Sequence, residues 1–124
     1  MNSVTETIKT ESIQSFQSTI RKMEKGLAQM KEKGANTTLI EKRLHAMRIG
    51  LALLENVWNR QSHHYGQGVL SDARTVLRGL MPSIEKAYAN SKTGSPQRTL
   101  LECRLKSLEL AIQAIDEQCR ECDV

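Results

Sequence analysis

The most constraining feature of the sequence is a seven-residue segment that occurs twice. Residues 38–44 read TLIEKRL, and residues 99–105, which lie 61 positions later, read TLLECRL. Five of the seven positions are identical, and matching residues continue at the same offset on both sides without a gap. A duplicated pair of helices would produce this pattern, so we expect two tandem helical hairpins.

The apolar residues around these segments alternate between spacings of three and four, the period of a helix that buries one side. Only 3% of the residues are aromatic, so the core must be aliphatic, which suits helices better than sheets. Short connections between helices place consecutive helices antiparallel. The sequence therefore predicts an all-α fold, an antiparallel four-helix bundle. The expected apolar seams are Ile13, Phe16, Ile20, Met23, Leu27, Met30; Ile40, Leu44, Met47, Leu51, Leu54, Trp58; Leu70, Ala73, Leu77, Met81, Ile84, Tyr88; and Leu101, Leu105, Leu108, Ile112, Ile115, Cys119, Cys122.

The chain of 124 residues is long enough for one domain with one core. We expect the first hairpin at about 10–58, a linker at 59–68 and the second hairpin at about 69–122. Pro82 lies inside the third helix, where it removes a backbone hydrogen bond. Because the apolar period continues through this proline, we predict a kink there rather than a break.

Local signals mark where these helices begin and end. Gly34 after two lysines predicts the end of the first helix. Thr38 with Glu41 forms the capping-box pattern that predicts the start of the second helix. For the fourth helix, Ser95 followed by Pro96 predicts the start. Thr99 offers a competing start a few residues later.

The charge is mild, +4 in total with a pI of about 9.1, and the two signs are interspersed. No segment approaches the roughly 18 consecutive apolar residues of a membrane span. Residues 1–7 have neither the basic start nor the apolar run of a secretory signal. We therefore expect a cytoplasmic protein that does not bind membranes.

The sequence contains no spacing that assembles a nucleophile, a base and an acid, and no phosphate-binding loop. We expect no enzymatic activity and no cofactor. Cys119 and Cys122 have the C-x-x-C spacing of metal and redox sites. A zinc site needs four ligands, however, and both cysteines fall on the apolar seam. We expect no metal site, while the choice between core residues and ligands stays open.

Residues 45–50 (HAMRIG) resemble the phosphorylated segment of histidine phosphotransfer domains, which are also four-helix bundles. The resemblance places His45 at the phosphorylated position, with Met47 and Arg48 in place of a leucine and a lysine. It implies a phosphotransfer role for His45. Ile49 stands where the family has a small residue, and this departure puts that role in doubt.

The second helix carries an additional apolar series beside its seam: Leu39, Ala46, Ile49, Leu53 and Val57. Such a wide apolar face needs more than one partner helix. We therefore expect a non-enzymatic protein-interaction module (an adaptor, inhibitor, chaperone or regulator) that binds another protein and also forms a homodimer. The expected contact residues are Ile49 and Leu53, together with His63, His64 and Tyr65 in the linker.

An alternative hypothesis is an association with nucleic acid. Basic residues cluster on the first two helices, and such a face can follow a phosphate backbone. The residues of this basic face are Arg21, Lys22, Lys25, Arg43 and Arg48. Aromatic residues for base stacking are scarce, however, so we favour the protein partner.

Overall fold

The computed structural model describes residues 5–59 and 65–122, without the side chains of 119–122. It contains four helices: α1 (Glu6–Glu32), α2 (Thr38–Asn59), α3 (Gln67–Asn90) and α4 (Pro96–Cys122). No strand occurs in the described ranges, and the helices pack as a four-helix bundle. The predicted all-α fold is therefore confirmed. None of the described helices is both long and apolar enough to cross a lipid bilayer.

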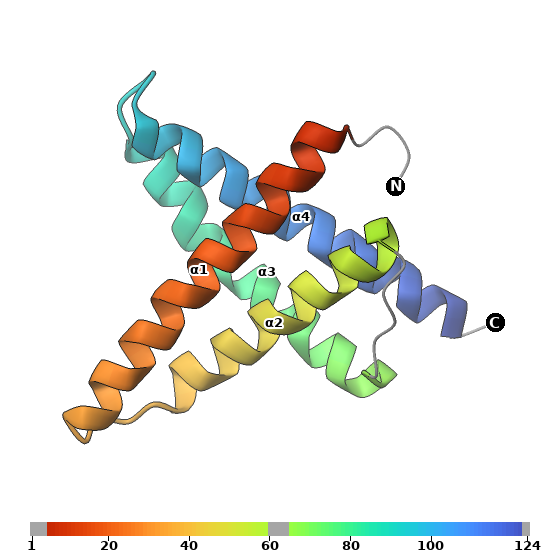
Figure 1. Cartoon of the computed structure of the whole chain (residues 1–124), viewed down its shortest axis with the longest axis horizontal. Helices are drawn as coiled ribbons and strands as arrows, with labels where there is room; N and C mark the ends of the chain where they lie inside the picture. Colours follow the sequence, from red (N-terminus) through yellow and green to blue (C-terminus); the bar gives the residue numbers. More distant parts are fainter. Residues whose placement is uncertain (1–4, 60–64, 123–124) are drawn as a thin grey trace.

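The helices form two V-shaped pairs that lie across each other (Figure 1). α1 and α2 diverge from the turn at 33–37, and α3 and α4 diverge from the turn at 91–95. α2 and α4 each pack against all three other helices, whereas the backbones of α1 and α3 do not approach each other closely. A wedge therefore stays open between α1 and α3, with α2 and α4 beneath it. The duplication of a hairpin stays a prediction.

The helix ends follow local chemistry, with one shift of register. Ser95 accepts a hydrogen bond from the Arg98 N–H (3.2 Å), which confirms the predicted start of α4 at Pro96. The predicted start of α2 at Thr38 is confirmed, although the side-chain contact to Glu41 comes from Thr37. Asn36 Oδ1 accepts a hydrogen bond from the Thr38 N–H (3.0 Å) and so satisfies a free donor in the first turn of α2. It is the Thr37 hydroxyl that donates to the Glu41 carboxylate (3.0 Å).

Two further predictions concern glycine and proline. Gly34 has a φ of 69°, the left-handed conformation that ends a helix, so the predicted end of α1 is confirmed. Pro82 lies inside α3, which continues as a helix on both sides of it. The kink at Pro82 stays a prediction.

The core is aliphatic apart from Phe16, which is fully buried. Positions separated by 61 residues are buried alike, for example Phe16 with Leu77 and Leu54 with Ile115, all 0% exposed. Burial of each such side chain contributes about 1.5–3 kcal/mol. The largest fully buried side chains come from all four helices: Phe16, Ile49, Leu53, Leu54, Leu70, Leu77 and Ile115.

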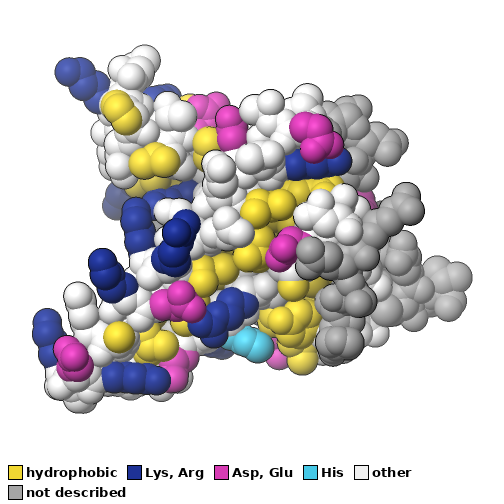
Figure 2. Space-filling model, viewed as in Figure 1, with side chains coloured by type: hydrophobic (Ala, Val, Ile, Leu, Met, Phe, Trp, Pro, Cys, Tyr) yellow, Lys and Arg dark blue, Asp and Glu magenta, His cyan; other side chains and the backbone are white. Residues whose placement is uncertain are grey.

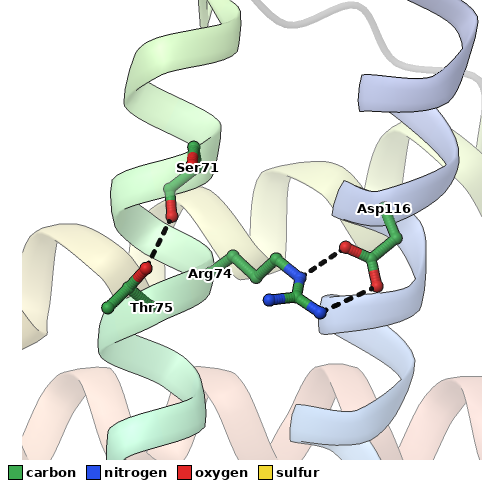
Figure 3. Close-up of polar contacts among 4 residues, drawn as sticks. All are labelled: Ser71, Arg74, Thr75 and Asp116. Atoms are coloured by element: carbon green, nitrogen blue, oxygen red, sulfur yellow. Dashed lines mark hydrogen bonds and ion pairs between the residues drawn. The ribbon is translucent and has the colours of Figure 1, made fainter.

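Ion pairs join neighbouring helices at the rim of this core. Arg74 on α3 and Asp116 on α4 form a two-pronged contact, in which the Arg74 Nε and a terminal nitrogen each donate to one carboxylate oxygen (Figure 3). Arg48 on α2 donates to Glu24 on α1 (2.7 Å). Because all four side chains are partly exposed, each pair contributes only about 0–1 kcal/mol.

Gly50 lies where three helices meet. A Cβ atom at this position would lie 2.9 Å from Cε1 of Phe16 on α1 and 3.2 Å from Cδ1 of Leu77 on α3. Both of these side chains are fully buried, so neither can turn out into solvent without loss of burial. Glycine inside a helix costs about 1 kcal/mol relative to alanine. The close approach of the three helices explains why α2 nevertheless carries a glycine at position 50.

We expect Gly50→Val to lower the free energy of unfolding by about 1–3 kcal/mol, because the branched side chain overpacks the contact with Phe16 and Leu77. Urea denaturation measures this change. The matched control is Gly79→Val on α3, where a Cβ would have no neighbour within 4 Å. The control should change stability by no more than about 0.5 kcal/mol. Equal effects of the two variants would contradict the close approach at Gly50.

Candidate binding surface between the helix pairs

The wedge between α1 and α3 contains a cleft of about 220 Å³ to which all four helices contribute. We call it the central cleft. No acidic side chain is among the described residues that line it. Its lining residues are Ser15, Thr19, Met23, Arg43, Met47, Gly79, Leu80, Ser83, Ile84, Arg104, Ser107 and Leu108.

Two arginines line the central cleft, Arg43 from α2 and Arg104 from α4. They stand 61 positions apart and occupy the same place in the two repeated segments. The ion pairs among the described residues are Lys9–Glu6, Arg48–Glu24 and Arg74–Asp116, so neither cleft arginine has a carboxylate partner there. Guanidinium groups stay charged at all ordinary pH values. The central cleft therefore carries two permanent positive charges that have no ion-pair partner among the described residues.

The remaining lining residues are apolar or carry hydroxyl groups. The Thr19 hydroxyl donates to the Ser15 carbonyl (2.8 Å) and the Ser107 hydroxyl donates to the Arg104 carbonyl (2.9 Å), so both of these donors are used within their own helices. The hydroxyls of Ser15 and Ser83 donate to no other described residue and remain available. The apolar wall is formed by Met23, Met47, Leu80, Ile84 and Leu108.

An outer groove adjoins the central cleft on each side. The Leu100 groove, of about 290 Å³ between α1 and α4, shares Arg104 with the cleft. The Leu39 groove, of about 180 Å³ between α2 and α3, shares Arg43. Leu39 and Leu100 are 59% and 53% exposed, an unusual exposure for leucine, and they too stand 61 positions apart. The two grooves are therefore continuous with the cleft through its arginines.

We call the central cleft and its two outer grooves the basic strip. Four basic residues line it, namely Lys22, Lys42, Arg43 and Arg104, against the single acidic residue Glu11. Figure 2 shows Lys and Arg side chains on the left of the molecule, where the wedge between the helix pairs opens. The surface combines positive charge with exposed leucine and suits an acidic, partly apolar partner.

The residues predicted to contact a partner lie elsewhere. Ile49 and Leu53 are both 0% exposed within the single chain, because the other helices cover this part of the second apolar series. A partner cannot touch them while the bundle is closed, so we do not retain them as contact residues. Tyr65 is half-buried against the core. His63 and His64 lie outside the described residues.

The predicted basic face is exposed but divided. Arg21, Lys22, Lys25, Arg43 and Arg48 are all exposed on α1 and α2. Lys22 and Arg43 belong to the basic strip, whereas Arg48 is engaged with Glu24. The acidic Glu24 thus interrupts the positive charge along this face.

The histidine and the two cysteines that the sequence analysis considered for chemistry lie on α2 and α4. His45 is exposed on α2, in a groove that also contains Asp72 of α3. Cys119 and Cys122 lie in the last turns of α4, and their side chains are outside the described part of the chain. The described residues contain no group of three or more His, Cys, Asp or Glu side chains that could hold a metal ion.

Cys103 is a free, half-buried thiol between the Leu100 groove and a neighbouring groove. Burial and the negative charges of Glu11 and Glu102 raise the pKa of this thiol above its ordinary value. Its sulfur lies 3.9 Å from the Glu11 carboxylate, to which the thiol donates a weak hydrogen bond. Because the thiolate is the reactive form, this environment makes Cys103 a poor nucleophile.

Comparison of the chain with protein families, curated proteins and solved structures gave no match. The basic strip therefore has to be interpreted from its own chemistry.

The sequence prediction included Lys22 and Arg43 of the basic strip but not Arg104 or the exposed leucines, although a signal for them was present. Arg43 and Leu39 are two of the five positions that are identical in the repeated segment. Identity at exposed positions cannot come from core packing, which constrains only the buried ones. The exposed positions of the repeat therefore point to the surface on which the basic strip lies.

We expect Glu11→Gln to accelerate the alkylation of Cys103 by iodoacetamide at pH 8. The substitution removes a charge that raises the thiol pKa, so the pKa falls and the thiolate fraction at pH 8 increases. Burial remains, so the rate should stay below that of a fully exposed cysteine. Peptide mass spectrometry measures the Cys103 rate separately from the other thiols. Glu85→Gln on α3 is the control, and an equal rate in both variants would contradict the role of Glu11.

Proposed function

We propose that this chain is a non-enzymatic protein-interaction module that binds an acidic partner through the basic strip. The observation that carries the proposal is the pair of arginines, without an ion-pair partner among the described residues, in a cleft flanked by exposed leucines. Charged residues of one sign are normally interspersed with the other on a solvated surface. A concave surface that collects basic side chains beside exposed leucines instead favours recognition of a complementary protein.

The shape of the strip supports a partner that presents one continuous segment. The grooves follow one another from the α1–α4 contact across the wedge to the α2–α3 contact. An amphipathic helix or extended segment could place apolar side chains beside Leu39 and Leu100 and acidic side chains at the arginines between them. This is the mode of binding that we propose.

Self-association is the second part of the proposal. Leu39 and Leu100 are exposed at related positions in the two helix pairs. A homodimer formed with a twofold axis brings the same surface of each subunit together, so exposed leucines would be buried in pairs. Val69, which is 40% exposed at the start of α3, extends the apolar surface beside the Leu39 groove.

We expect the double variant Arg43→Glu, Arg104→Glu to lose the partner that co-purifies with the wild-type chain from its own source. The reversed charges would repel the acidic groups that the arginines attract, and this like-charge repulsion weakens binding. Native mass spectrometry at moderate salt identifies the bound species and its stoichiometry.

Arg78→Glu is the matched control, because Arg78 is exposed on α3 and does not line the basic strip. The control should retain the partner. Loss of the partner in both variants, or in neither, would contradict the assignment of the strip. Bound nucleic acid in place of protein would instead support the alternative basic face, and its binding should then weaken steeply with salt.

We expect Leu39→Glu combined with Leu100→Glu to shift a dimer to a folded monomer, because both positions are exposed and neither belongs to the core. Sedimentation velocity measures the association, and circular dichroism verifies the fold. In contrast, Ile49→Glu should unfold the chain, since it places a charge among fully buried residues. A sedimentation coefficient that is identical in the wild type and the Leu39, Leu100 variant would contradict self-association through these leucines.

A further inference from the structure

We propose that the central cleft is a binding site for a small amphipathic carboxylate, an acid with a short apolar chain. This inference goes beyond the proposed protein-interaction role and does not depend on it. It rests on three properties of the cleft: its charge, the apolar character of its wall and its volume.

The charge selects an anion. Arg43 and Arg104 line the same cleft from different helices, and no described carboxylate lies within ion-pair distance of either. Two permanent cations that share a concave site repel each other, and an anion between them removes that repulsion. A guanidinium group matches the planar geometry of a carboxylate and can hold it through two parallel hydrogen bonds.

The hydroxyl groups add donors for the same anion. Ser15 and Ser83 line the cleft from α1 and α3, and their hydroxyls donate to no other described residue. The hydroxyls of Thr19 and Ser107 already donate to carbonyl groups of their own helices, so these two donors are not available to the anion. The cleft therefore offers two cations and two free hydroxyl donors, a set that satisfies the several acceptor sites of a carboxylate.

The wall selects an apolar body attached to the anionic group. Met23, Met47 and Leu108 face the cleft together with Leu80 and Ile84. Inorganic anions such as phosphate would leave this wall in contact with water. An aliphatic chain would cover it, with a gain of about 0.8 kcal/mol for each buried CH₂ group. The flexible methionines adapt readily to chains of different shape.

The volume limits the size of the acid. The cleft measures about 220 Å³. A short-chain acid such as hexanoate is small enough for this space, whereas a longer chain would extend into the outer grooves. Of the residues in the wall, two methionines also provide convenient spectroscopic probes.

The test is a titration with sodium hexanoate, followed by NMR. The whole chain is labelled with ¹³C at the methionine methyl groups. We expect the NMR signals of Met23 and Met47 to shift in a saturable manner, because both side chains line the cleft. The signal of Met30, near the end of α1 and outside the cleft, should not move. Met→Leu variants assign the three signals.

Two variants connect the binding to the arginines. Arg43→Gln with Arg104→Gln should weaken hexanoate binding by about tenfold or more, since it removes both charged donors. Arg43→Lys with Arg104→Lys keeps the charge and should restore part of the affinity. A circular dichroism spectrum identical to that of the wild type verifies that each variant is folded. If the double glutamine variant does not fold, Arg43→Gln alone, at an exposed position, provides the comparison.

Matched probes distinguish the chemistry of the ligand. Hexylammonium chloride has a comparable chain but a positive charge, and inorganic phosphate has negative charge but no chain. Neither should reproduce the saturable shifts of Met23 and Met47. Equal shifts with hexylammonium would overturn the role of the arginines, and equal shifts with phosphate would overturn the role of the apolar wall. Hexanoate binding that is unchanged in the glutamine variants would overturn the site itself.

Discussion

The contact of the Phe16 ring with the backbone at Gly50 is the constraint on which the arrangement of the helices depends. Because Gly50 has no side chain, Phe16 from α1 and Leu77 from α3 can both reach the same point of α2. α2 thus receives neighbours on both sides, and the same helix also packs against α4. α1 and α3 both lie against α2 near Gly50, but the two helix pairs cross each other. The backbones of α1 and α3 therefore stay apart, and a wedge opens between them.

The wedge in turn explains why the candidate binding surface lies at this place. If α1 and α3 packed against each other and closed the wedge, Arg43 and Arg104 would be buried at a high desolvation cost. Otherwise, arginine could not occupy these positions. On the rim of a wedge, their apolar stems can lie along the methionines and leucines while the guanidinium groups remain hydrated. One structural feature therefore accounts for both the apolar wall and the positive charge of the basic strip.

Helical periodicity predicted the fold class, and the Ser95–Pro96 signal predicted the start of α4, because both depend on local chemistry. Sequence reasoning placed Ile49 and Leu53 at an interface, since a wide apolar face appeared to exceed what three neighbouring helices could cover. The crossed arrangement covers Ile49 and Leu53, whereas Leu39 of the same series stays exposed. A crossing angle depends on contacts between distant residues, such as Gly50 with Phe16, and no local pattern encodes it. The central cleft was not predicted for the same reason, since its lining comes from four helices.

The two cleft arginines lie on α2 and α4, so the packing of these helices in the core determines where the arginines stand on the surface. These two helices pack directly against each other, so the side chains between them fix the separation of Arg43 and Arg104. Interiors are close-packed, and a change of one methylene group displaces the neighbouring helices. In the proposed binding site, a conservative exchange in the core would therefore alter ligand preference without changing any residue that the ligand touches.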